Sequence, residues 1–353
     1  MLILSIDTSC DETAAAITEG RRVLSNVIYS QILLHKKWGG VVPSIAKRAH
    51  EERIDFVIDE TFRKLKVKRY ELGVKRVDYI AVTQGPGLAV ALEVGIKKAK
   101  ELAARYKKKL IAINHMEGHI YSCFVQNSQG SPKRKFRFPY LALLVSGGHT
   151  ELVIFKNHLQ YEVIGQTIDD AAGEALDKAA KLLGLGYPGG PVIERLAAEI
   201  DNKDIYRFPR PMLRSNNLNF SFSGLKTSFY YFLKKLNKLN NYHMTVYGSN
   251  LRELASSFQR AVFDTLIYKT EKAVKETKIN RLVVGGGVIA NLYLRRLLQR
   301  LIKKYSGQVF FPPFKYLTGD NAVMIGVAAY YKAKKNLLVK NLSTLDRVPR
   351  LSL

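Results

Sequence analysis

Two histidines with helical spacing are the first candidates for chemistry in this chain. His115 and His119 lie four residues apart in the segment INHMEGHIY, residues 113–121. On a helix the positions i and i+4 share one face, so both imidazoles can bind one metal ion. Glu117 stands about 200° around the helix from His115 and points away from that face. In the zinc-protease pattern H-E-x-x-H the glutamate occupies another position of the turn, so this spacing argues against a protease.

An acidic residue can complete such a site. Asp320 lies in YLTGDNAVMIG, residues 316–326, directly before a segment with the apolar pattern of a helix. Two histidines and one aspartate form a mixed set of nitrogen and oxygen donors, which suits Zn or Fe(II). The alternative is a histidine pair that belongs to an ordinary helix and binds no metal.

Two polar turns that follow apolar strands can bind phosphate groups. The turn DTSC, residues 7–10, offers hydroxyls and backbone amides. The turn VSGGHT, residues 145–150, offers Ser146 and two glycines, Gly147 and Gly148, which permit close approach of a ligand to the backbone. Each turn alone is also consistent with a plain β-hairpin. Their matching positions in two similar units favour a nucleotide held between two domains.

A third glycine turn lies in VVGGGVIAN, residues 283–291, between a predicted strand and a predicted helix. The glycine spacing is not that of a Rossmann fingerprint, but three bare residues let a base or ribose lie against the backbone. Asn291, expected one turn into the helix, can bond a ribose or phosphate, and a glycine-rich packing turn is the alternative. Asp177 lies on another predicted helix, and the turn of Gly189 and Gly190 after it makes a ribose or substrate contact plausible. A solvated aspartate is the alternative there.

Strands that alternate with helices must position these residues, and this alternation indicates an α/β fold. A strand, a polar turn and a returning strand occur twice, in residues 2–17 and 140–155, which indicates an internal repeat. The polar segment 128–137 is the best linker candidate. We therefore expect two domains, residues 1–130 and 131–353, with the last helix able to pack back on the first. Residues 218–236 read as a strand that runs into a helix, and 236–249 as a loop.

The charge of the chain favours a polyanionic partner. Its 353 residues include 56 Lys and Arg against 30 Asp and Glu, a net charge of +26. Such a field attracts nucleic acid, although a general drift of composition toward lysine is the alternative. The basic residues concentrate at 97–109, 131–137 and 295–304, where few aromatics accompany them, so phosphate contact is favoured over base stacking. Two cysteines support no disulfide framework and fit a reducing cytoplasm. No apolar run approaches the length of a membrane span.

A set of motifs spread along the chain resembles one protein family. The motifs are IDTSCDETAAAI, GGVVPSIAKRAH, GPGLAVALEVG, INHMEGHI, LLVSGGHTELV, IDDAAGEALDKAAKLLGLGYPGGP, NFSFSGLKT, GGGVIAN and GDNAVMIG. Together, from residue 3 to about residue 333, they resemble the bacterial TsaD family, the catalytic component that makes threonylcarbamoyladenosine in tRNA. The resemblance implies an actin/Hsp70-like ATPase fold, with two related RNase H-like domains and a ligand cleft between them.

The resemblance also implies site residues, ligands and partners. The metal, Fe(II) or Zn, is expected on His115, His119 and Asp320. The nucleotide part of threonylcarbamoyl-AMP, or ATP, ADP or AMP in its place, is expected on a larger set: Leu144, Val145, Ser146, Gly147, Gly148, Asp177, Gly190 and Asn291. Family members transfer threonylcarbamoyl to adenosine 37 of ANN-decoding tRNAs and release AMP, usually with TsaB-like and TsaE-like protein partners in the cytoplasm.

Two questions remain open at the level of sequence. An adenine amine is a poor nucleophile, and our hypothesis for the general base is Asp11, in the turn that follows the first strand. The alternatives to an acyltransferase are a small-molecule kinase on the same fold and a non-catalytic scaffold subunit that binds tRNA. The His, His, Asp set discriminates against both alternatives.

Overall fold

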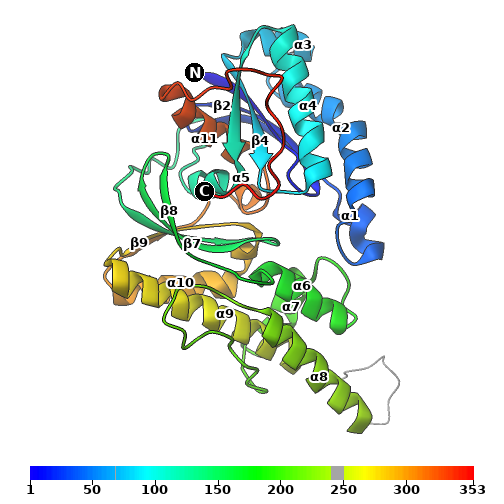
Figure 1. The fold of residues 1–353 in the computed structure, drawn as a ribbon, viewed down its shortest axis with the longest axis vertical. Helices are drawn as coiled ribbons and strands as arrows, with labels where there is room; N and C mark the ends of the chain where they lie inside the picture. The colour runs from blue at the N-terminus through cyan, green and yellow to red at the C-terminus, as the bar shows by residue number, and fades with distance from the viewer. Residues whose placement is uncertain (68, 240–249) are drawn as a thin grey trace. The chain divides into compact units, whose positions relative to one another are not determined.

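The computed structural model describes residues 1–67, 69–239 and 250–353, which form two compact units (Figure 1). The first unit contains residues 1–138, 157–161 and 311–353, and the second contains residues 139–156 and 162–310. The expected boundary after residue 130 falls inside the first unit, and the last helix belongs to that unit. Of the expected loop at 236–249, residues 236–239 are helical and the remainder lies outside the described residues.

The first unit is built on a five-stranded mixed sheet with strand order β3-β2-β1-β4-β5. Strand β1 runs antiparallel to β2 and parallel to β4. The strands are β1 (Leu2–Asp7), β2 (Glu12–Glu19), β3 (Arg22–Ser30), β4 (Tyr79–Gly85) and β5 (Lys109–Asn114). The helices are α1 (Ile32–His35), α2 (Pro43–Arg63), α3 (Tyr70–Arg76), α4 (Ala89–Arg105), α5 (His115–Ser122) and α11 (Ala322–Lys334), with short 3-10 turns η1 (Lys36–Trp38) and η3 (Lys315–Leu317).

The second unit repeats this sheet. Its strand order, read from β8, is β8-β7-β6-β9-β10, and β6 runs antiparallel to β7 and parallel to β9. The strands are β6 (Tyr140–Val145), β7 (Thr150–Asn157), β8 (Gln160–Gln166), β9 (Arg281–Gly285) and β10 (Gln308–Phe310). The helices are α6 (Ala172–Leu182), α7 (Gly189–Ala198), α8 (Ser223–Leu239), α9 (Asn250–Thr277) and α10 (Leu292–Lys304), with the 3-10 turn η2 (Gly287–Ala290). The predicted internal repeat is therefore confirmed.

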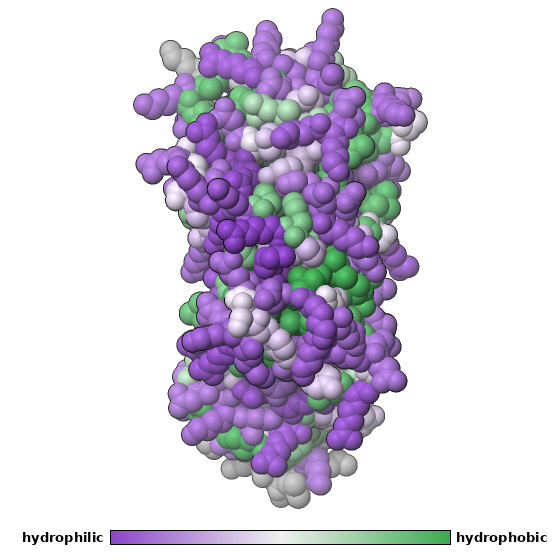
Figure 2. All heavy atoms as spheres, turned by 90° about the vertical axis from the view of Figure 1, so that its left-hand side faces the viewer, coloured by the Kyte–Doolittle hydropathy of each residue, from purple (hydrophilic) through white to green (hydrophobic). Residues whose placement is uncertain are grey.

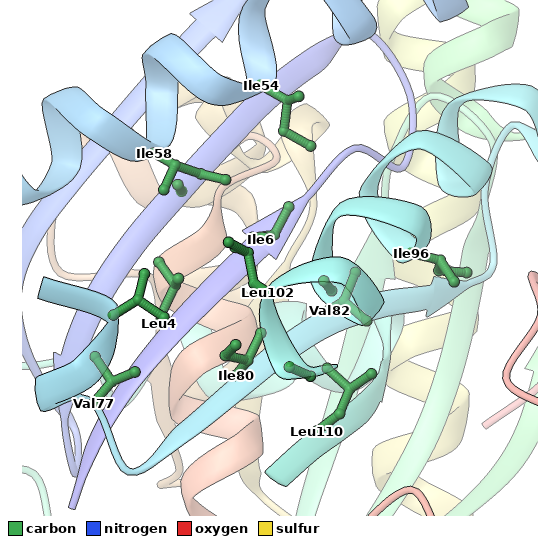
Figure 3. Close-up of a cluster of buried hydrophobic side chains, with 14 of the residues drawn as sticks. Leu4, Ile6, Ile54, Ile58, Val77, Ile80, Val82, Ile96, Leu102 and Leu110 are labelled. Carbon is green, nitrogen blue, oxygen red and sulfur yellow. The ribbon is translucent and has the colours of Figure 1, made fainter. Parts of the chain in front are cut away.

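The central strand β1 has apolar residues on nearly every position because both faces of the sheet are covered. Leu4 and Ile6 pack against α2 and α4, in the cluster drawn in Figure 3. On the other face the Ser5 hydroxyl donates to the Ala322 carbonyl at 2.6 Å, which fixes the start of α11 on the sheet. Gly326 permits this close approach, because a Cβ there would lie 2.6 Å from Thr18 Oγ1. Figure 1 shows α11 on the opposite side of this sheet from α2 and α4.

Some predicted elements differ from the structure. The strand expected before α8 is only an isolated bridge between Thr167 and Phe220. Strands β3 and β8 were not predicted, because their residues are mostly half-buried or exposed and lack a continuous apolar pattern. Within the described residues, no helix has the length and apolar character needed to cross a membrane.

Candidate metal centre and glycine cradle

Helix α5 presents the two histidines from the end of a central strand. Asn114 ends β5 and caps the helix, and its side-chain Oδ1 accepts from Met116 N at 2.8 Å and Glu117 N at 3.4 Å. This cap starts the helix at His115, so His119 lies one turn later on the same face. The helical spacing predicted from the sequence is confirmed. Both histidine side chains are buried.

Asp320 is brought to these histidines by the start of α11. Asn321 caps that helix by accepting from Met324 N at 3.0 Å, while its side-chain amide donates to the Gly319 carbonyl at 2.9 Å. The turn directs the Asp320 carboxylate toward α5, where its Oδ1 lies 3.2 Å from His115 Nε2 and 3.4 Å from His119 Nε2. The structure therefore assembles in one place the three residues singled out from the sequence.

The donor set fits a bound metal ion. One ligand atom from each residue can be chosen so that all lie within 4.8 Å of one another. Ligand atoms about 2.1 Å from one tetrahedral ion lie about 3.4 Å apart, close to the spacing between carboxylate and imidazoles. Among the described residues, neither ring nitrogen of His119 has a hydrogen-bond partner although both are buried. A buried polar atom in that state is costly, and a metal on Nε2 would satisfy it.

Electrostatics couple the three residues and Asp7. Burial by itself lowers the pKa of His115, but the carboxylates of Asp320 and Asp7 outweigh it and raise that pKa to about 10. Burial lowers the pKa of His119. The two imidazoles hold the pKa of Asp320 well below its usual range despite its burial. Asp7 Oδ2 lies 3.7 Å from His115 Nδ1, and Thr83 Oγ1 donates to Asp7 Oδ1 at 2.8 Å. This second carboxylate lies beyond hydrogen-bond distance of the ring, so it acts on His115 through its charge.

Glu117 faces away from the metal centre, as the helical spacing predicts. Its carboxylate forms an ion pair at 2.9 Å with Lys332 of α11, whose ammonium also donates to the Ala112 carbonyl at 3.1 Å. The next residue, Gly118, lets the two helices approach, because a Cβ there would lie 3.0 Å from the Met324 side chain. Glu117 therefore joins α5 to α11 and does not face the histidines, which removes the geometric basis of a protease.

Asp11 lies in the turn between β1 and β2 and is 8% exposed. Burial and the charge of Asp11 are the two largest causes that raise the pKa of Cys10 well above its usual value. The same two causes raise the pKa of Glu12, and the charge of Asp320 adds to both shifts. The Cys10 thiol is therefore neutral at pH 7 and is no thiolate nucleophile.

In the second unit, the turn after β6 exposes two glycines. Leu144 and Val145 end the strand and are fully buried. Ser146 N donates to the His149 carbonyl at 2.9 Å, and His149 N donates to Ser146 Oγ at 3.1 Å, so the turn is tightly closed. A Cβ added at Gly147 or Gly148 would meet no atom within 4 Å. Open space therefore lies beside the backbone of this turn.

Asp177 organises the second glycine pair. Its Oδ1 accepts from Gly189 N at 2.7 Å and from Gly190 N at 3.2 Å. The predicted glycine turn is wrong: the two glycines are the first residues of α7, because a carboxylate from α6 satisfies their amides and starts the helix. A Cβ at Gly189 would lie 2.3 Å from the Ala180 Cβ, whereas one at Gly190 would meet no atom within 4 Å.

The triple-glycine segment lies against the same strand end. Gly286 has φ +97°, and a Cβ there would lie 2.3 Å from the Val145 carbonyl oxygen, so only glycine fits. The next residue, Gly287, again opens on empty space. We name the four open positions, Gly147, Gly148, Gly190 and Gly287, the glycine cradle.

Asn291 is the N-cap of α10 and does not lie one turn inside the helix, because residues 287–290 form the 3-10 turn η2. Its Oδ1 accepts from Tyr293 N and Leu294 N, each at 3.0 Å, and its amide donates to Gln259 Oε1 at 2.8 Å. Sequence reasoning missed Gln259, since a single glutamine in a long amphipathic helix gives no signal of its own. Asn291 therefore fixes the backbone beside the glycine cradle through contacts with its own helix and α9.

Glu151 is the partner of Leu144 across the β6–β7 ladder, and burial raises the pKa of its carboxyl to about 7. The folded state thus holds a proton that the unfolded chain loses near pH 4.5. The protonated Glu151 carboxyl therefore contributes fully to the stability of the folded state below pH 4.5. As the pH rises to about 7, the free energy of unfolding falls by about 3 kcal/mol. We expect Glu151→Gln to unfold at higher urea than the parent at pH 8 and at nearly equal urea at pH 4.5. Equal shifts at both pH values would contradict the raised pKa.

Solved structures define the class of protein to which this fold belongs. The activator of the 2-hydroxyisocaproyl-CoA dehydratase from Clostridium difficile matches 97% of this chain and 99% of its own at a TM-score of 0.52 and 14% identity. HypF from T. kodakarensis matches 95% of this chain and 48% of its own at a TM-score of 0.60 and 14% identity. At this identity the likeness concerns the fold alone, and the two mixed sheets agree with the predicted actin/Hsp70-like fold of two related α/β domains.

Closer relatives define the family. The family model described as TsaD, tRNA N6-adenosine threonylcarbamoyltransferase, matches residues 22–327. The chain is 44% identical to the tRNA N6-adenosine threonylcarbamoyltransferase of Thermosipho africanus over 353 residues, 100% of both chains. It is 48% identical to that of Geotalea uraniireducens over 339 residues, 96% of this chain and 93% of the relative. The chain belongs to the TsaD family.

Proposed function

We propose that this chain transfers the threonylcarbamoyl group of threonylcarbamoyl-AMP to N6 of adenosine 37 in ANN-decoding tRNAs. The observation that carries the proposal is identity of 44% to a threonylcarbamoyltransferase over the full chain, in a protein that keeps the His115, His119 and Asp320 set together. In this acyl transfer the amine nitrogen forms a bond to the carbamoyl carbon. The bond from that carbon to the phosphate oxygen breaks, AMP leaves with the electron pair, and N6 loses one proton.

The glycine cradle would hold the AMP part of the donor. Bare backbone at Gly147, Gly148 and Gly287 gives a flat adenosine close access, and Gly190 leaves open space beside the start of α7, whose first two amides bond Asp177. A glycine turn such as that of Gly147 and Gly148 favours a phosphate through its backbone N–H groups. Asp177 and Asn291 would act by fixing these backbone segments, because their side chains already bond the turns that they join. Preorganised donors of this kind need little rearrangement as charge develops on the leaving phosphate.

His115, His119 and Asp320 would hold one divalent ion, Fe(II) or Zn according to the donor types. When bound, such an ion supplies Lewis-acid polarisation and a fixed positive charge for phosphate or threonyl oxygens. The chain itself contributes the orientation of the ligands. Asp7 supplies negative charge beside His115, and Asn321 positions Asp320 through the turn at the start of α11.

Asp11 would act as the general base that takes the proton from N6. We expect Asp11→Asn to lower kcat for transfer by about 10² to 10⁴, the usual contribution of a positioned base. Metal content and the affinity for AMP should stay at the parent level. Glu12→Gln is the matched control, because it makes the same kind of change at the neighbouring carboxyl, whose pKa burial and the charge of Asp11 raise well above its usual value. A full transfer rate in Asp11→Asn, or an equal loss in the control, would exclude this role.

A direct assay tests the proposed function. Purified chain, tRNA and threonylcarbamoyl-AMP are combined with and without TsaB-like and TsaE-like proteins, which we propose as its partners in the cytoplasm. The expected products are AMP and tRNA with a modified adenosine, measured by mass spectrometry of digested nucleosides. Transfer of phosphate from ATP to a small molecule would instead identify a kinase. Binding of tRNA without transfer under any partner condition would identify a scaffold subunit.

A further inference from the structure

A cationic cavity of about 560 Å³ lies in the first unit and includes none of the metal-centre residues. Its walls come from the β2–β3 turn, the segment 126–136, the β7–β8 turn and the C-terminal end of α11. Five cationic side chains line it: Arg21, Arg22, Arg134, Lys135 and Lys334. The single acidic residue in the wall, Glu19, forms an ion pair with Arg22. The excess of positive charge favours an anionic ligand with several charges.

Two of the arginines are held in place by the backbone. Arg134 Nη1 donates to the carbonyls of Cys123 at 2.5 Å and Phe311 at 2.6 Å. Arg21 Nη1 donates to the Arg134 carbonyl at 2.6 Å, and its guanidinium lies 5.5 Å from the centre of the Phe136 ring. These contacts fix the guanidinium groups before any ligand arrives, which lowers the entropy cost of binding.

Aromatic rings and the side chain of Gln126 form the rest of the wall. Tyr331 stacks on His158 with ring centres 3.9 Å apart, and Tyr330 meets Tyr331 edge to face at 5.0 Å. Burial and the charges of Lys335, Lys334 and Arg21 lower the pKa of His158 to about 4, so the ring is neutral at pH 7. The positive charge of the cavity therefore comes from arginine and lysine and stays constant over the physiological pH range. Figure 2 shows a side of the molecule covered mainly by hydrophilic residues.

Helix α11 runs from the metal centre to the cavity. Asp320 lies two residues before its first residue, and Tyr330, Tyr331 and Lys334 lie at its C-terminal end. Its 13 residues make it about 20 Å long. A mononucleotide cannot reach from one end to the other, so a ligand that engages both must be a macromolecule.

We propose that this cavity binds backbone phosphates of the tRNA, an inference that rests on the proposed function for the identity of its ligand. Arginine and lysine side chains supply most phosphate contacts in nucleic-acid complexes, and such contacts position the substrate without reading its sequence. The cavity would thus hold the body of the tRNA while the target adenosine reaches the reaction site.

The double variant Lys135→Ala/Lys334→Ala tests this proposal. Both lysines have exposed side chains at the edge of the cavity. We expect tRNA affinity, measured by fluorescence anisotropy, to fall about tenfold or more at moderate salt. The slope of log affinity against log salt should become shallower by about 0.7 to 0.9 for each phosphate that the variant no longer neutralises. In the transfer assay the loss should fall on KM for tRNA and not on kcat.

The matched control is Lys75→Ala/Lys340→Ala, which removes the same charge from exposed lysines of the first unit outside the cavity. This control should keep parent tRNA affinity and salt slope. An equal loss in the control, or an unchanged slope in the test variant, would overturn the proposal. If the parent binds tRNA through these lysines yet transfers nothing, the proposed function is wrong and tRNA binding at the cavity is supported. If the parent transfers normally and the variant binds tRNA as the parent does, only the proposed role of the cavity is wrong.

Titration with small anions distinguishes an RNA site from a site for free phosphate. The ring protons of His158 report occupancy of the cavity by NMR, because an anion would offset the cations around this imidazole. We expect tRNA to shift these signals and millimolar inorganic phosphate or AMP to leave both the signals and tRNA binding unchanged. Competition by phosphate or AMP at such concentrations would make this a small-anion site and overturn the proposal.

Discussion

Replacing His119 with alanine is expected to remove the bound metal and to lower threonylcarbamoyl transfer about a thousandfold. The imidazole is fully buried, its Nε2 faces Asp320 at 3.4 Å, and no other described residue bonds it. Without it only two of the three ligands remain, and a metal that polarises a reacting oxygen is worth several kcal/mol. Elemental analysis of the purified variant gives the metal content, and the nucleoside assay gives the rate.

Glu117→Gln is the control for this experiment, because it changes the same helix on the opposite side. It removes the charge that pairs with Lys332 but leaves the histidines untouched. We expect some loss of thermal stability with parent metal content and a transfer rate within a few fold of the parent. Metal retained in His119→Ala would contradict the proposed ligand set. Loss of activity with intact metal in Glu117→Gln would instead indicate a role for the glutamate in the reaction.

Adding one methyl group at Gly190 is expected to weaken nucleotide binding without lowering the free energy of unfolding. The residue lies in the first turn of α7, and a Cβ there meets no protein atom within 4 Å. Alanine is also the better helix former, so Gly190→Ala should keep or raise the free energy of unfolding, by up to about 1 kcal/mol. If a nucleotide fills the open space, the methyl group should weaken AMP binding about tenfold or more, by crowding the ligand. Isothermal titration calorimetry and urea unfolding measure the two effects on the same sample.

Gly224→Ala is the matched substitution outside the glycine cradle. Gly224 lies in the first turn of α8, where an added Cβ comes no closer than 3.6 Å to the Pro211 side chain. It should leave AMP affinity unchanged. Parent affinity in Gly190→Ala would show that the ligand does not lie against α7. A similar loss in Gly224→Ala would mean that the effect is indirect.

The three proposed metal ligands show how much of the site the sequence predicts and where prediction ends. The pair on α5 was visible because a helix places i and i+4 on one face, a local rule that needs no tertiary structure. The third ligand lies 205 residues away from His115. No periodicity connects such positions, and Asp320 emerged only from its donor type and from the family resemblance. Its actual placement depends on Gly326, which lets α11 lie close to the sheet.

The elements that differ from the prediction have separate physical causes. Glycine is a poor helix former, so the sequence predicts a turn at Gly189 and Gly190, yet the carboxylate of Asp177 starts a helix there. Strands β3 and β8 were not predicted because they lie at sheet edges, where half of each strand faces outward. The basic stretch 131–137 was visible in the sequence and supplies Arg134 and Lys135, but the cavity itself could not be predicted, because four separate segments form its wall.

The order of the two units along the chain sets the order of events during synthesis. Residues 311–353 belong to the first unit, although the whole second unit lies between them and residues 1–138. Until those residues emerge, the sheet lacks the helix that covers one face, and His115 and His119 lack their aspartate. Chains are made from the N-terminus, and domains generally fold as units in that order. Loading of a metal ion at the proposed site is therefore expected to be a late step in biogenesis, and a chain interrupted within the second unit carries the two histidines but lacks Asp320.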